Sequence, residues 1–82
     1  MITAEQLRAA RALVKMTQEE LATACEVSVP TIKRWEGGTG LLTGSAASVA
    51  AAQAALESAG VEFIAENGGG PGVRLRKGGV KT

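Results

Sequence analysis

Residues 17–38 read TQEELATACEVSVPTIKRWEGG, and this stretch contains start and stop signals for two short helices. Thr17 and Glu20 have the spacing of a capping box, in which each side chain bonds a free N–H of the first helical turn. Ser28 is a favourable N-cap residue, and Pro30 then falls in the first turn, where its missing N–H costs nothing. The Gly-Gly pair at the end of the stretch predicts the end of the second helix. We therefore expect two short helices joined by a tight turn.

The second helix of this pair divides into an inward and an outward face. At about 100° per residue, Ile32 points toward the core and Trp35 lies beside it. Pro30, Lys33 and Arg34 then fall on the opposite side. We expect Trp35 to belong to the core rather than to stack on a base. A short helix with outward cations, preceded by another short helix, is typical of a helix-turn-helix, whose second helix enters the major groove of DNA.

The stretch resembles the helix-turn-helix of phage-repressor-like (XRE-type) transcriptional regulators. The resemblance covers roughly residues 3–58. The positions that match in order and spacing are Thr17, Gln18, Leu21, Ala22, Val27, Ser28, Thr31, Ile32, Trp35, Glu36 and Gly38. One position departs from the family pattern, because Glu26 stands where these regulators usually have Gly. A left-handed backbone there would be mildly strained for a residue with a Cβ atom.

The resemblance implies a DNA-binding surface and a structural ion pair. The surface comprises Gln18, Ser28, Val29, Pro30, Thr31, Lys33 and Arg34. In it, Gln18 would face a phosphate or a base edge, and Arg34 would bond a guanine or a phosphate. Val29 and Pro30 are apolar and would contact a thymine methyl. The implied ion pair joins Arg11 to Glu36 and braces the first helix against the end of the third. The alternative for the two adjacent cations is that they only solubilise an exposed helix.

Capping signals also predict the remaining helices. Thr3 and Gln6 have capping-box spacing and open a first helix, on which Arg8 can point to solvent. Ser45 precedes a fourth helix, and Gly60 stands where a C-terminal glycine would end it. The loop between the third and fourth helices contains two adjacent leucines, at positions 41 and 42, that we expect to tuck under the domain.

After Gly60 the periodicity changes from helical to alternating. The runs VEFIAE and GVRLRK flank the turn-forming run NGGGPG, which predicts a β-hairpin. Its acidic side chains at positions 62 and 66 can pair across the strands with the arginines at 74 and 76. Alternatives for these arginines are a solvated face or an arm on the DNA backbone. The predicted fold is mainly α: a phage-repressor-like helix-turn-helix bundle of about four helices with a C-terminal β-hairpin.

This division predicts three regions. Residues 1–59 form the DNA-binding domain, residues 60–77 the hairpin, and residues 78–82 a disordered tail. We expect the apolar face of the hairpin to dock on the fourth helix and its open strand edges to join two chains into one larger sheet, giving a homodimer. The expected interface comprises Val61, Phe63, Ile64, Val73 and Leu75. The alternative is a monomer whose hairpin merely covers the fourth helix.

The composition excludes several classes of function. One cysteine and no histidine make a metal site implausible, and without His, Tyr or Asp no catalytic set emerges. We expect Cys25 to be a small buried hydrophobe, with a redox-sensor role as the alternative. The N-terminal stretch lacks the apolar run of a signal peptide or membrane span, so we expect a cytoplasmic protein with no cofactor and no small-molecule ligand.

Two functions remain open. The first is a sequence-specific transcriptional regulator, a repressor that binds double-stranded DNA as a dimer on a two-fold operator. The second is a protein-interaction module such as an antitoxin or antiactivator. Residues 1–66 hold five basic and eight acidic side chains, and this acidic balance keeps the second function open.

Overall fold

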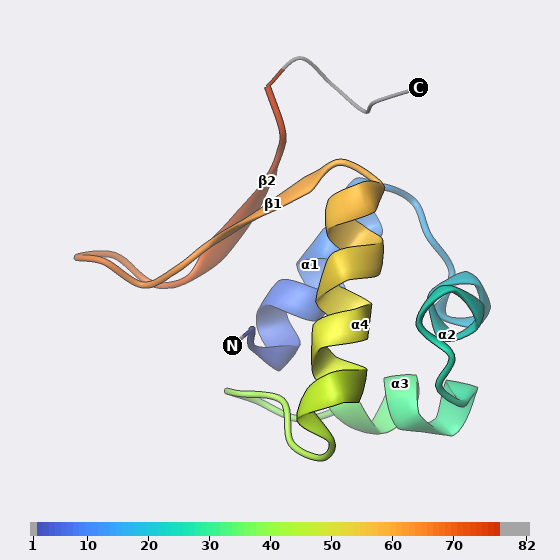
Figure 1. The fold of residues 1–82 in the computed structure, drawn as a ribbon. Coiled ribbons are helices and arrows are strands. Elements are labelled where there is room, and N and C mark those ends of the chain that lie inside the picture. The colour runs from blue at the N-terminus through green and yellow to red at the C-terminus, as the bar shows by residue number, and fades with distance from the viewer. Residues whose placement is uncertain (1, 78–82) are drawn as a thin grey trace.

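Four helices and a two-stranded antiparallel sheet make up residues 2–77, the part of the chain that the computed structural model describes (Figure 1). The predicted fold class is confirmed. The predicted tail, residues 78–82, lies outside the described residues. Among those described, no helix is both long enough and apolar enough to cross a membrane. The elements are α1 (Ala4–Leu13), α2 (Gln18–Cys25), α3 (Val29–Glu36), α4 (Ala46–Ser58), β1 (Val61–Ile64) and β2 (Gly72–Leu75).

Local capping explains where all four helices begin. Both predicted capping boxes are present, with Thr3 and Gln6 at the start of α1 and Thr17 and Glu20 at the start of α2. At α3 and α4 the cap is a serine hydroxyl that accepts a hydrogen bond from a backbone N–H three residues later. Since each cap satisfies donors that have no partner within the helix, a few polar side chains determine the helix starts.

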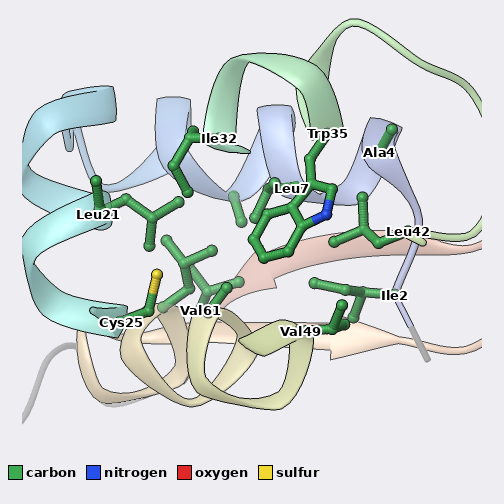
Figure 2. Close-up of a cluster of buried hydrophobic side chains, with 14 residues drawn as sticks. Ile2, Ala4, Leu7, Leu21, Cys25, Ile32, Trp35, Leu42, Val49 and Val61 are labelled. Atoms are coloured by element: carbon green, nitrogen blue, oxygen red, sulfur yellow. The ribbon is translucent and has the colours of Figure 1, made fainter. Parts of the chain in front are cut away.

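The core lies between the four helices and the first residue of β1. Its fully buried large side chains are Leu7, Leu21, Ile32, Val49, Leu56 and Val61. Figure 2 shows Trp35 reaching from α3 into this cluster, with Cys25 of α2 among the same side chains. Only 4% of Trp35 is exposed, and its Nε1 donates a hydrogen bond to the Thr43 carbonyl at 2.8 Å. The prediction that Trp35 is a core residue is confirmed.

The loop between α3 and α4 pairs with the N-terminal segment. Thr3 and Leu41 form an antiparallel β-bridge, and the N–H of Leu42 donates to the carbonyl of Ile2 at 3.2 Å. Leu42 is buried as predicted, but 62% of Leu41 is exposed, so the prediction for Leu41 is wrong. Successive side chains of an extended segment point to opposite faces, and only one of two adjacent leucines can enter the core.

The hairpin register confirms one predicted charge pair and corrects the other. Glu62 lies opposite Arg74, and two hydrogen bonds of 3.0 and 3.2 Å join their side chains. Those bonds and the charge of Arg74 hold the pKa of Glu62 below its usual value. Arg76, however, donates to the Glu57 carbonyl at the end of α4 rather than to Glu66. The register carries Arg76 past the start of β1, whereas Glu66 lies beyond the other end of that strand.

The hairpin docks on α4, as predicted, and also on α1. The side-chain amide of Gln6 donates to the carbonyls of Ile64 and Gly72, at 3.1 and 2.9 Å, and so ties the end of the ladder next to the hairpin turn to α1. Val61 is fully buried, but half of Leu75 stays exposed. Because Val61 and Leu75 lie opposite each other, the predicted apolar face of the hairpin is covered on the β1 side and open to solvent on the β2 side.

Candidate nucleic-acid interface

The outward side of α3 carries the two cations that the sequence assigned to DNA. Pro30, Lys33 and Arg34 are exposed, whereas Ile32 and Trp35 are buried beneath them. Within residues 2–77, neither cation takes part in an ion pair. Both charges are therefore available to a ligand that approaches this face.

The N-terminal end of α3 adds small polar and apolar groups to the same region. The Ser28 hydroxyl accepts a hydrogen bond from the Thr31 N–H at 3.2 Å and lies 2.9 Å from the Thr31 hydroxyl. These two hydroxyls are thus held in place by each other. Val29 is half-buried and packs on the core, so it contributes less surface than Pro30. The tip of the helix combines hydroxyls with short apolar groups, as base edges in a major groove require.

The turn before α3 sets the angle at which that helix leaves α2. Glu26 ends α2 with φ 59° and ψ 42°, which is the left-handed conformation expected for this position. The N–H of Val27 then bonds the Ala22 carbonyl at 3.1 Å, which closes the end of the helix. Three residues separate α2 from α3, and the arrangement is that of a helix-turn-helix.

The C-terminal end of α3 is held by what we call the Glu36 network, formed by Glu36, Arg11 and Gln18. Arg11 donates two hydrogen bonds to the Glu36 carboxylate, at 2.7 and 2.8 Å, and Gln18 donates a third at 3.1 Å. Burial opposes ionisation of Glu36, but the bonds from Arg11 and Gln18 outweigh it, and the pKa of Glu36 lies below its usual value. The network therefore joins α1, α2 and α3 through one carboxylate.

Gln18, which the sequence assigned to the DNA-binding surface, is a member of the Glu36 network. Its side-chain amide binds Glu36, while its position as the first residue of α2 places it in the first turn of that helix. Of the predicted DNA-binding residues within the described part of the chain, it is the one whose side chain hydrogen-bonds a side chain of another helix. This contact ties the start of α2 to the end of α3.

Arg8 is a further contact at this end of α3, and the sequence did not predict it. Its guanidinium donates to the carbonyls of Glu36 and Gly38 and so satisfies acceptors that the helix end leaves free. The prediction that Arg8 points to solvent is wrong. A signal was present, because Arg8 and Arg11 are three residues apart and hence share one side of α1.

A family model described as helix-turn-helix matches residues 7–52, which is more than half of the chain. The chain belongs to this helix-turn-helix family, and the predicted resemblance to XRE-type regulators is confirmed. The family comprises DNA-binding regulators, and the chain is a DNA-binding helix-turn-helix protein. No curated protein matches the chain. The matched residues end within α4, so the hairpin lies outside the match.

Proposed function

We propose that this protein is a sequence-specific transcriptional regulator that reads DNA with α3. The observation that supports the proposal is the contrast between the two sides of this helix. Its outer side presents cations that have no ion-pair partner within residues 2–77, while its inner side is anchored by Ile32 and Trp35 and its end by the Glu36 network. A rigidly held helix with an open polar face satisfies the geometric requirement for base readout.

Each residue of the face has a separate role in this proposal. Arg34 binds a guanine edge or a phosphate, and Lys33 neutralises the backbone. Pro30 and the exposed part of Val29 contact thymine methyl groups, while Ser28 and Thr31 offer hydroxyls. Gln18 holds the end of α3 through Glu36 and places the first turn of α2 near a phosphate.

We infer further that the regulator acts as a homodimer on a two-fold operator and represses transcription. A single reading helix with two free cations makes few contacts, and a second copy doubles them. The hairpin supplies the surface for this association, through Phe63, Ile64, Val73 and Leu75. Val61 is fully buried and supports that surface from within. A dimer seated in successive major grooves excludes other proteins from the same DNA, which is the physical basis of repression.

A protein-interaction module remains the second candidate. Residues 1–66 carry three more acidic than basic side chains, and Glu19 and Glu20 lie exposed together on α2. Such a surface attracts a basic partner protein rather than DNA.

Binding measurements with charge-matched variants test the main proposal. The preferred DNA is first selected from random duplexes with the purified protein. Lys33→Ala and Arg34→Ala should each weaken binding to it by about 1–3 kcal/mol at fixed salt if the side chain reads a base. The control is Lys77→Ala, which removes the same charge two residues after the end of β2 and should leave affinity unchanged. Retained melting temperatures will show that α3 still folds.

The same titration separates the two candidate functions. Binding that weakens as salt rises, while one sequence stays preferred, supports the regulator. Equal affinity of both α3 variants and the parent protein would show that α3 is not the reading helix. Failure to select any DNA sequence would favour the protein-interaction module.

A further inference from the structure

The outer edge of β2 presents an unpaired row of backbone groups. In an antiparallel ladder, directly opposed residues alternate between pairs that exchange hydrogen bonds and pairs that do not. The Arg76 N–H donates to the Gly60 carbonyl at 2.8 Å, so the bonded positions on β2 are 72, 74 and 76. The N–H and carbonyl groups of Val73 and Leu75 therefore point outward. Within residues 2–77 these groups have no hydrogen-bond partner.

The outer edge of β1 is less accessible than that of β2. The guanidinium of Arg76 lies 3.5 Å from the Val61 carbonyl, on the edge that β1 would offer. Along β1 the side chains are buried or half-buried, because this strand follows α4 directly and packs against it. Arg74 and Leu75 of β2 are exposed. The free edge of the hairpin is therefore that of β2.

Exposed apolar side chains are found on β2 and on α1, the helix that packs against β2. Exposed fractions of 50% for Leu75 and 39% for Leu13 make them two of the three large exposed hydrophobic residues among those described. Leu13 lies seven residues after Gln6 and hence on the same face of α1, the face that Gln6 uses to bind the hairpin. Strand β2 and α1 pack on each other. Apolar surface beside an unpaired strand edge is characteristic of strand addition.

We propose that two copies of the chain associate by antiparallel pairing of β2 with β2, with Arg74 opposite Arg74 of the second copy. This proposal rests on the dimeric regulator proposed above and narrows its interface to β2, so Val73 and Leu75 lie at the contact while Phe63 and Ile64 of β1 lie outside it. The pairing gives a four-stranded sheet in the order β1-β2-β2-β1, and its two-fold symmetry makes the contact self-complementary. Figure 1 shows the hairpin and α3 on different sides of α4, so the association leaves α3 uncovered.

The register follows from the residues along β2. Centring the pair on Arg74 places Val73 opposite Leu75, so that all four outward backbone groups of each strand find partners. Centring it on Val73 would place Leu75 opposite Pro71, which has no N–H to donate. Centring it on Leu75 would place Arg74 opposite Arg76 on both sides of the axis. In the proposed register Arg76 instead faces Gly72.

Glu62 makes this self-pairing compatible with the charge of Arg74. Like charges that face each other across a strand pair are destabilising. Here each Arg74 is already bound by two hydrogen bonds to Glu62 of its own chain. Across the four strands the side chains would follow the order Glu62, Arg74, Arg74, Glu62, so each arginine would lie beside an acid. We assign to Glu62 a positioning role, in which its carboxylate neutralises the charge of Arg74 at the centre of the interface.

Disulfide cross-linking of full-length variants tests the register. Opposed positions that do not exchange hydrogen bonds have Cα atoms roughly 4.5 Å apart, within the range of a disulfide. Arg74→Cys should therefore form a covalent dimer in air, about tenfold faster than the control Arg76→Cys, which faces Gly72. Native Cys25 is buried and stays in both variants. Mass spectrometry of the linked peptides confirms that position 74 joins to position 74.

Light scattering during size-exclusion chromatography tests the role of Glu62. Glu62→Gln should raise the dissociation constant of the dimer by about fivefold, because it leaves two arginines facing each other. Glu66→Gln removes the same charge in the turn region and should leave the constant unchanged. If Glu62→Gln and Glu66→Gln behave alike, the positioning role of Glu62 is wrong.

These measurements separate the interface from the function. A parent protein that is dimeric, combined with equal cross-linking of the two cysteine variants, would overturn β2 pairing and leave the dimeric regulator standing. A parent protein that stays monomeric on its own and on the selected DNA would overturn both. Selective cross-linking at position 74 supports both.

Discussion

Glu36 shows at the scale of one residue how a buried charge is made stable. Its side chain is almost fully enclosed, which by itself disfavours the ionised form. Three hydrogen bonds from Arg11 and Gln18 compensate, and Arg8 adds a positive charge nearby. A buried acid of this kind destabilises the fold when its partners are lost, because the remaining charge is neither solvated nor paired.

The lowered pKa of Glu36 predicts a pH-dependent contribution to stability. A carboxylate whose pKa is lower in the folded state stabilises the fold above its unfolded value, about 4.3, and this contribution is lost as pH falls through the folded value. Glu36→Gln should therefore cost about 1–3 kcal/mol at pH 7, and the difference from the parent protein should shrink on acidification to about pH 3. Urea unfolding at several pH values measures this.

Glu66→Gln is the control for that experiment, since Glu66 is an exposed acid in the turn region. It should unfold like the parent protein at every pH. The pKa values of Glu5 and Glu62 are also lowered, and their contributions remain in both variants. A difference between Glu36→Gln and the parent protein that stays constant from pH 7 to pH 3 would contradict the assigned role.

At the scale of the element, the turn between α2 and α3 depends on one backbone conformation. Glu26 adopts left-handed φ and ψ values. This conformation is unfavourable for a residue with a Cβ atom but not for glycine. The tight connection requires this conformation whatever residue is present. The helix-turn-helix geometry therefore imposes the left-handed conformation on Glu26, although a glutamate disfavours it.

That strain predicts an inverted order of stability at position 26. In an ordinary helix alanine is more stable than glycine, but here Glu26→Gly should be more stable than Glu26→Ala by about 1 kcal/mol. Both variants remove the same charge, so their difference reports the backbone alone. Thermal melting of the two proteins measures it. Higher stability of the alanine variant would mean that the turn relaxes in solution.

At the scale of the whole molecule, size and symmetry limit how two copies reach DNA. The described chain extends 33 × 32 × 20 Å, and Figure 1 shows α3 and the hairpin on different sides of α4. In the proposed dimer, two copies joined through their hairpins are therefore large enough to place their α3 helices in successive major grooves, which lie about 34–36 Å apart.

The proposed dimer predicts that affinity depends on the phase of the half-sites. Insertion of about five base pairs between the half-sites of the selected operator turns one of them to the opposite face of the DNA and should abolish tight binding. Insertion of about ten base pairs returns both half-sites to the same face of the DNA and should recover part of the affinity, although the half-sites are then farther apart. Gel-shift titration of the three duplexes measures this. Equal binding to all three would indicate independent monomers.

Local features of the sequence determined the helix starts, the outward face of α3 and the hairpin. Caps act within four residues, and the alternation of Val61 to Ile64 and of Val73 to Leu75 is equally local. The helix-turn-helix was predictable for the same reason, because its capping, turn and core positions lie within one continuous stretch. The spacing of Glu62 and Arg74 predicted their pairing once the turn between them was recognised.

Tertiary structure alone decided which distant groups the long polar side chains bind. Gln6 reaches carbonyls 58 and 66 residues away, and Arg8 reaches the end of α3. The choice between Leu41 and Leu42 for the core also depended on the pairing of their loop with the N-terminal segment. Flexible polar side chains have many possible partners along a sequence, and only the packing of α1 against α3 and the hairpin leaves these carbonyls as the acceptors within reach.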